Sequence, residues 1–177
     1  MANVDVLDEK GNKTGEAKSM NEIHARGLWH RAVHVWFVNS KNELLLQLRA
    51  KDKINYPNMW DISAAGHVDS GEEPEESALR EIKEEIGLDL SREKLEKIGE
   101  IKQQSVINNN TYFDNEFNDV YLVRMDLDLD HLKLQPDEVA KLRYVSISEL
   151  KEWTSKGNLV VPHQQEHELL FKVLENS

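Results

Sequence analysis

The segment Gly66–Leu88 constrains the fold of this chain more strongly than any other stretch of its sequence. Pro74 stands near the start of a periodic pattern, acids fill its first turn, and Gly87 follows its last apolar residue. These signals predict a helix over Pro74–Ile86. On a wheel of about 100° per residue, its apolar side chains fall on one side. They are Ala78, Leu79, Ile82 and Ile86. The helix therefore needs a core to pack against, and the strand-like segments elsewhere make a sheet the natural partner.

A second side of the same helix is acidic. Glu81, Glu84 and Glu85 share an arc of about 100° on the wheel. Carboxylates three and four residues apart repel one another, so solvent, an arginine or a metal ion must compensate. Oxygen ligands of this kind suit hard cations such as Mg²⁺ and Mn²⁺, which also bind substrate phosphates. Arg80 lies beside Glu84 on the wheel and can hold a carboxylate in place. A solvated acidic face is the simpler alternative.

The composition limits the binding partners and the kinds of catalysis that we expect. The 33 acidic and 22 basic residues give a formal charge of -11, which argues against broad binding to nucleic-acid polymers or anionic membranes. An acidic protein that handles phosphates needs cations to screen the repulsion. The absence of cysteine excludes disulfides, thiolate metal ligands and a cysteine nucleophile. The sequence shows no signal peptide and no apolar span, so we expect a cytoplasmic protein.

The rest of the chain predicts an α+β fold in a single domain, 1–177, without repeats or linkers. We expect an N-terminal extension, 1–29, with a hairpin over Asn3–Ser19. Further strands are predicted over His30–Asn39, Glu43–Arg49, Trp60–Ala65, Gly99–Ile107, Phe117–Met125 and Leu142–Val145, and helices over Ser146–Trp153 and Gln164–Leu174. The last helix carries an apolar stripe that fits either the core or the interface of a homodimer, formed by Leu169, Leu170, Val173 and Leu174.

The complete spacing of the acidic segment is more specific than the helix alone. Five residues separate Gly66 from Glu72, seven more lead to Arg80, and further acids follow at fixed intervals. The segment thus resembles the Nudix box, G-x5-E-x7-R-E-U-x-E-E-x-G-U, at every fixed position. The resemblance implies a Nudix-type α/β/α sandwich with a mixed central sheet, and hydrolysis of nucleoside diphosphates linked to another moiety. It also implies bracing by Glu72 and Arg80, and Mg²⁺ or Mn²⁺ held by Gly66, Glu81, Glu84 and Glu85.

Residues outside the box carry a second resemblance, to Nudix-fold isopentenyl-diphosphate isomerases. It spans roughly His30 to Trp153 and rests on His30, Arg49, Lys53, Pro57, Trp60, Gly66-His67, Asp114 and Glu116. In those isomerases, metal is bound at the positions of His30, His67, Glu85, Asp114 and Glu116. Their catalytic cysteine, however, falls at Ala65, and a methyl group cannot move a proton to or from carbon. We therefore predict an isomerase-like Nudix hydrolase rather than an isomerase.

Several side chains outside the helix complete the predicted site. Arg49 and Lys53 are predicted to bind the diphosphate of a small-molecule substrate, although a solvated loop would look the same. His67 is predicted to contact substrate. Glu116 is predicted to accept a proton from water, with Glu138 as the second choice. The predicted catalytic set is Arg80, Glu81, Glu84, Glu85 and Glu116.

The sequence leaves three points open. No role is assigned to His24, His30 and His34. The leaving group and the number of metal ions are undetermined. The alternative to a hydrolase is a non-catalytic Nudix-fold sensor that binds a phosphorylated ligand.

Overall fold

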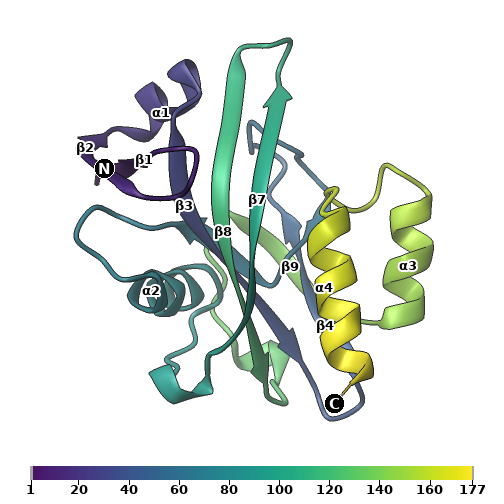
Figure 1. Cartoon of the computed structure of the whole chain (residues 1–177). Helices are drawn as coiled ribbons and strands as arrows, with labels where there is room; N and C mark the ends of the chain where they lie inside the picture. The colour runs from purple at the N-terminus through teal and green to yellow at the C-terminus, as the bar shows by residue number, and fades with distance from the viewer. Residues whose placement is uncertain (1, 177) are drawn as a thin grey trace.

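A computed structural model describes residues 2–176 and shows one mixed sheet with helices on both faces (Figure 1). Its strands are β1 (Val4–Leu7), β2 (Lys13–Lys18), β3 (Trp29–Val38), β4 (Glu43–Arg49), β5 (Trp60–Asp61), β6 (Ala64–His67), β7 (Glu96–Ile107), β8 (Tyr112–Arg124) and β9 (Val139–Ser146). Its helices are α1 (Met20–Arg26), α2 (Pro74–Ile86), α3 (Ile147–Ser155) and α4 (Gln164–Glu175), with short 3-10 turns η1 (Arg92–Lys94) and η2 (Leu129–His131). In the described part of the chain, no helix has the length and apolarity needed to cross a membrane.

Strand β3 is the centre of the sheet because it pairs with β1, β4, β6 and β8. The first three pairings are antiparallel and the fourth is parallel. The parallel ladder joins Trp29–Val38 to residues 115–124. Parallel neighbours need a long crossover, and here the intervening chain includes α2. Strand β7 pairs with β8, and β9 pairs with β4. The sheet is mixed, as predicted.

Two apolar cores lie on opposite faces of the sheet. Figure 1 shows α2 on one side and α3 with α4 on the other. The predicted apolar side of α2 packs on alternate β3 residues, namely Val33, Val35 and Phe37. On the other face, the C-terminal stripe packs with Trp36, and Leu170 and Leu174 are buried. Leu169 and Val173 are partly buried against the same core, so the stripe packs within the fold, and the homodimer stays a prediction. Burying each such side chain contributes roughly 1.5–3 kcal/mol.

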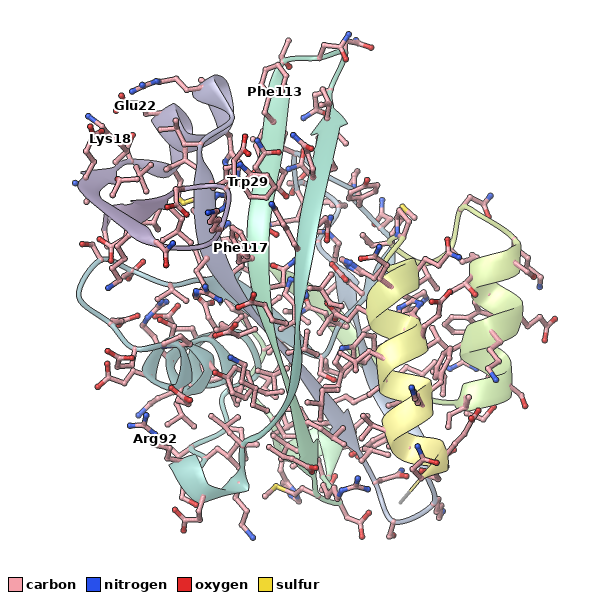
Figure 2. The ribbon with its side chains drawn as sticks, viewed as in Figure 1. Lys18, Glu22, Trp29, Arg92, Phe113 and Phe117 are labelled. Atoms are coloured by element: carbon pink, nitrogen blue, oxygen red, sulfur yellow. The ribbon has the colours of Figure 1, made fainter. Side chains whose placement is uncertain are left out.

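The N-terminal residues form the predicted hairpin, as β1 and β2, and then a helix that we did not predict. The Ser19 side chain caps α1 by accepting a hydrogen bond from the Glu22 backbone N–H, and Gly27 ends the helix with φ 65°. These two signals were readable, but seven residues are too few to show a helical period. Figure 2 shows Trp29 and Phe117 beside this unit, and their ring centroids lie 5.3 Å apart.

Several predicted strands differ from the structure in their boundaries. The predicted strand Trp60–Ala65 is two strands, β5 and β6, because β5 pairs with β4 whereas β6 pairs with β3. The predicted strands Gly99–Ile107 and Phe117–Met125 are longer at their N-terminal ends, as β7 and β8. Polar residues there hid the extension, since hydrogen bonds between the two strands do not need apolar side chains. The turn between them is built from three asparagines with positive φ, Asn108, Asn109 and Asn110.

Candidate active site

Paired residues of β3, β6 and β8 place polar side chains on one face of the sheet, in rows about 7 Å apart. The register assigns the rows as His30 and Glu116; Ala32, His67 and Asn118; and His34, Ala65 and Val120. Helix α4 reaches this face at the third row, where Glu166 contacts His34. The face thus carries the candidate site residues of three strands that are far apart in sequence.

A cluster of histidines and carboxylates occupies the first two rows. Its ligand atoms fall into two overlapping groups within 4.8 Å, His24–His30–His67 and His30–Asp114–Glu116. The Glu116 Oε1 atom lies 3.3 Å from His30 Nε2 and 3.5 Å from His67 Nε2. His30 Nε2 and Asp114 Oδ1 are buried without a hydrogen-bond partner among the described residues. Converging imidazole and carboxylate donors with orphaned atoms fit a transition-metal ion.

The same cluster sets the charges of its members. Burial raises the pKa of Asp114, and the nearby Glu116 raises it further. Burial works against ionisation of Glu116 too, but the nearby imidazoles of His30 and His67 hold the pKa of Glu116 well below its ordinary value. Burial opposes a charge on His30, yet Glu116 and Asp114 raise the pKa of His30. Glu116 therefore stays an ionised carboxylate, as a ligand or a proton acceptor requires.

His24 joins the cluster from α1, and the sequence had left its role open. Its Nε2 atom lies 3.3 Å from Asp114 Oδ1 and 2.9 Å from the Tyr112 hydroxyl. The Tyr112 ring stacks on the imidazole with centroids 4.0 Å apart. The capping residues of α1 were the signal that could have placed His24, because they fix the helix that carries it.

The Nudix-like segment brings its glutamates to the edge of β6. The Glu85 side chain is only 5% exposed; its Oε1 accepts from the Ala65 backbone N–H (2.8 Å) and its Oε2 from Gln47 Nε2 (3.2 Å). Glu81 lies against Gly66, where a Cβ atom would fall 2.1 Å from the Glu81 Cδ. Only glycine leaves room for this contact.

Burial makes two of these glutamates weaker acids than an exposed glutamate. It raises the pKa of Glu85 to about 8 and the pKa of Glu81 to about 7. Glu84 is different, because half of its side chain is exposed. Two partly desolvated carboxylates beside an open glycine backbone suit an oxygen-ligated cation, which would take the place of the protons that they otherwise hold.

Arg80 links an acidic side chain of α2 to the loop before the helix and to the end of β6. Its guanidinium donates to Glu81 (2.6 Å), to Glu72 (3.1 Å) and to the His67 carbonyl (3.1 Å). Its Nη1 also lies 3.6 Å from Glu84. The arginine therefore ties α2 to the loop before it and to the end of β6.

Arg49 and Lys53 already have partners in the protein. Arg49 donates to the Asn55 carbonyl (3.0 Å) and to Asp61 (3.2 Å), and Lys53 donates to Glu138. Both residues thus fasten the loop at 50–59 near the site, and their roles toward substrate stay predictions. Glu138, the second choice for a base, is tied to Lys53 rather than to the histidine cluster.

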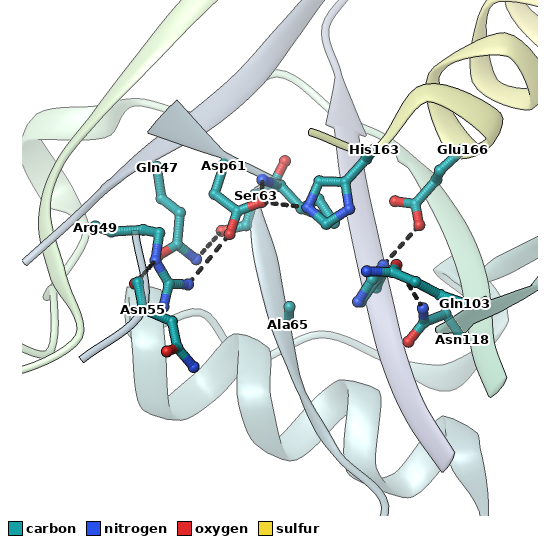
Figure 3. A network of polar contacts seen from close by, with 12 residues as sticks. Gln47, Arg49, Asn55, Asp61, Ser63, Ala65, Gln103, Asn118, His163 and Glu166 are labelled. Atoms are coloured by element: carbon teal, nitrogen blue, oxygen red, sulfur yellow. Dashed lines mark hydrogen bonds and ion pairs between the residues drawn. The ribbon is translucent and has the colours of Figure 1, made fainter. Parts of the chain in front are cut away.

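A network of polar side chains that the sequence did not single out surrounds Ala65 (Figure 3). It brings together β4, β5 and β8 with the start of α4. Asp61 accepts from His163 (2.9 Å) as well as from Arg49, and although burial opposes it, these partners lower the pKa of Asp61 to about 2. His163 is 102 residues from Asp61 and Glu166 is 132 residues from His34, so no local pattern could have revealed these pairs.

Comparison with known proteins agrees with this geometry. A family model described as the NUDIX domain matches residues 28–164. Nudix hydrolase 3 of Arabidopsis thaliana is 45% identical over 155 residues, which are 86% of this chain and 20% of that protein. The chain therefore spans about one fifth of that relative. An isopentenyl-diphosphate delta-isomerase of Pectobacterium atrosepticum is 32% identical, and the match covers 85% of this chain and 79% of the isomerase.

Solved structures show the same fold. A crystal structure of a Deinococcus radiodurans protein superposes with a TM-score of 0.73 over 96% of this chain and 98% of that chain, at 22% sequence identity. The predicted α+β sandwich is confirmed by this neighbour and by the layers described above. The family matches also support the predicted enzyme class, a pyrophosphohydrolase.

Proposed function

This chain belongs to the Nudix hydrolase family, and on that premise we propose that it is a metal-dependent hydrolase of the diphosphate bond in an organic diphosphate, such as a nucleoside diphosphate derivative. One observation carries the proposal. The box glutamates Glu81 and Glu85 converge on the backbone of Gly66 and Ala65, in a cradle that only glycine leaves open. Burial makes these carboxylates hold protons unless a cation replaces them.

Two groups of side chains contain the atoms that would hold Mg²⁺ or Mn²⁺. Glu81, Glu84 and Glu85 with the Gly66 carbonyl form the oxygen-only set, and the histidine cluster forms a second, mixed set. A divalent cation bound at the oxygen set would neutralise phosphate oxygens and make a water molecule more acidic. Arg80 donates a hydrogen bond to Glu81 and two more to Glu72 and the His67 carbonyl, which ties the helix to the loop before it.

Glu116 is our candidate for the proton acceptor. It stays ionised at neutral pH and its Oε1 lies 3.5 Å from His67 Nε2, in the residue after the box glycine, so we infer that it takes a proton from the attacking water. Its competing role is to ligate a cation in the histidine cluster. The cytoplasmic location and the homodimer stay predictions.

Two other functions are disfavoured. We do not expect this chain to share the activity of the isomerase named among its relatives, because Ala65 supplies no proton donor or acceptor. If purified protein interconverted isopentenyl and dimethylallyl diphosphates, this rejection would fail. A non-catalytic sensor is disfavoured because every glutamate of the box is retained.

A hydrolysis screen that identifies the products by chromatography tests the proposal, because nucleotide sugars and dinucleotides yield phosphate monoesters rather than inorganic phosphate. It covers nucleoside diphosphates, nucleotide sugars, dinucleotides and isoprenoid diphosphates, with Mg²⁺ and with Mn²⁺. The control is the double variant E84Q/E85Q, which should lose at least about 10–100-fold in kcat/KM. Unchanged turnover in that variant would refute the metal assignment. Calorimetry that shows ligand binding without product formation would favour the sensor.

A further inference from the structure

The third row of the candidate face carries a histidine that the proposed mechanism does not use. His34 is paired with Ala65 on one side and Val120 on the other, so the three side chains point to the same face. Ala65 and Val120 are apolar, so the His34 imidazole is the polar group of this row. His34 therefore lies beside Ala65, one row beyond His67.

Glu166 fixes the orientation and the charge of His34. The His34 Nδ1–H donates to Glu166 Oε1 (2.6 Å), while the Trp36 indole N–H donates to the other carboxylate oxygen (2.8 Å). Burial opposes a charge on His34, but Glu166 raises the pKa of the imidazole to about 9. Both ring nitrogens are therefore protonated at neutral pH. Among the described residues, no hydrogen-bond acceptor is seen for the Nε2–H.

A second polar atom on this face also lacks a partner. Asn118 lies in the second row, and its side chain is fully buried. Its amide donates weakly to Gln103 Oε1 (3.4 Å), while its Oδ1 atom has no partner among the described residues. Figure 3 shows Asn118 and Gln103 on the same side of the network as Glu166. Buried polar atoms are nearly always hydrogen-bonded, so this oxygen needs a donor from outside the chain.

The polar lining continues past His34. The His163 ring lies 5.5 Å from the His34 ring and is held by Asp61, which Arg49 also contacts. The surroundings of Ala65 thus offer a cationic N–H donor, an amide oxygen and a second histidine. A hydrocarbon group placed here would leave these atoms unpaired, which costs far more than losing an equal apolar contact.

We propose that His34 and Asn118 form a subsite for a hydroxyl-bearing group of the substrate, such as a sugar ring attached to the diphosphate. A hydroxyl oxygen accepts from His34 Nε2–H, and a hydroxyl proton is donated to Asn118 Oδ1. Glu166 is a positioning residue that holds the imidazole. This inference rests on the proposed function, because it names the organic part of the substrate whose diphosphate is cleaved.

Two diphosphate substrates that carry different organic groups test the subsite. UDP-glucose carries a hydroxylated ring on each side of its diphosphate, whereas geranyl diphosphate carries a hydrocarbon. We expect wild-type kcat/KM to be at least about 100-fold higher for UDP-glucose. The variant H34L should lose about 100-fold with UDP-glucose and stay within about 3-fold with geranyl diphosphate. N118L should show the same selective loss, about 10-fold.

Controls separate the subsite from folding and from catalysis. H131A removes a histidine whose side chain is 84% exposed and should change neither substrate. H34Q keeps a neutral donor and should recover part of the UDP-glucose activity. In E166Q, the His34 imidazole should titrate at lower pH by NMR, a change that a purely structural role of Glu166 would not produce.

The outcomes distinguish this inference from the proposed function. Equal wild-type activity on the two probes, or equal losses in H34L, would overturn the subsite while leaving the hydrolase intact. If neither probe is cleaved, calorimetry with the same pair decides: tighter binding of UDP-glucose that H34L abolishes supports the subsite, and equal binding overturns it. Failure of every diphosphate in the wider screen is the separate result that overturns the hydrolase.

Discussion

Replacing Gly66 by alanine should damage the site without unfolding the protein. The new Cβ atom would fall 2.1 Å from the Glu81 Cδ, and side-chain atoms essentially never approach a Cβ closer than 3.0 Å. The carboxylate must therefore move by at least about 0.9 Å. It would leave the Gly66 backbone and strain its 2.6 Å hydrogen bond from Arg80. A displacement of about 1 Å in a catalytic group can cost about 100-fold, so we expect G66A to lose about that factor in kcat/KM.

The assay is substrate hydrolysis at increasing Mg²⁺ or Mn²⁺, together with thermal unfolding. Gly71 provides the matched control, because it lies in the segment that follows β6, has φ 92° and has nothing within 4 Å of the position that a methyl group would take. G71A should cost about 1–3 kcal/mol of stability through backbone strain, while its metal requirement stays normal. G66A should show the opposite pattern, a raised metal requirement with a small change in Tm.

A double-mutant cycle sharpens the test. If G66A acts by displacing Glu81, then E81A and G66A/E81A should have equal activity, because the second change has nothing left to displace. Wild-type activity and an unchanged metal requirement in G66A would refute the reasoning. Losses that multiply in the double variant would show that Gly66 acts through some other contact.

Three further predictions concern other parts of the site. Burial raises the folded-state pKa of Glu85 from 4.5 to about 8, so between these values the folded state holds more protons than the unfolded state. The Tm of metal-free protein should then fall as pH rises from about 4.5 to 8, and E85Q should flatten that fall in calorimetric scans. H24A should lower the amount of Mn²⁺ or Zn²⁺ retained by the histidine cluster in elemental analysis, while retention that matches wild type would exclude His24 as a ligand. S19A should destabilise α1 by about 1 kcal/mol and weaken the same metal binding through His24, as equilibrium dialysis would measure.

Much of the helix α2 and its bracing could be predicted because the signals are local. Pro74 and Gly87 mark the helix in the sequence, and its period of 3.6 residues separates the apolar side from the acidic side. The resemblance added the roles of Gly66 and Arg80, and their contacts agree with them. The helical wheel could not show that Glu85 accepts a hydrogen bond from the Ala65 backbone N–H. Every residue except proline has such a donor, so the sequence does not mark it.

The histidine cluster and the His34 pair could be predicted only in part because they depend on topology. His30 and Glu116 become neighbours through the parallel pairing of β3 with β8, and alternation within each strand does not reveal which strand lies beside it. His24 lies on α1, and this helix is too short to show a helical period in the sequence. Glu166 reaches His34 across 132 residues. Local sequence patterns predict which face of a helix or strand is buried. These contacts depend instead on the order of strands in the sheet, which local patterns do not predict.

The distribution of charge explains why such a site needs cations from solution. Around the candidate site, Arg80 is committed to Glu72 and Glu81, Arg49 to Asp61, and Lys53 to Glu138. These side chains neutralise the protein's own acids, and the chain as a whole carries a formal charge of -11. A diphosphate brought among unscreened carboxylates would be repelled. We therefore infer that divalent cations supply the positive charge for the diphosphate, which leaves the proposed subsite of His34 and Asn118 to select the organic group of the substrate.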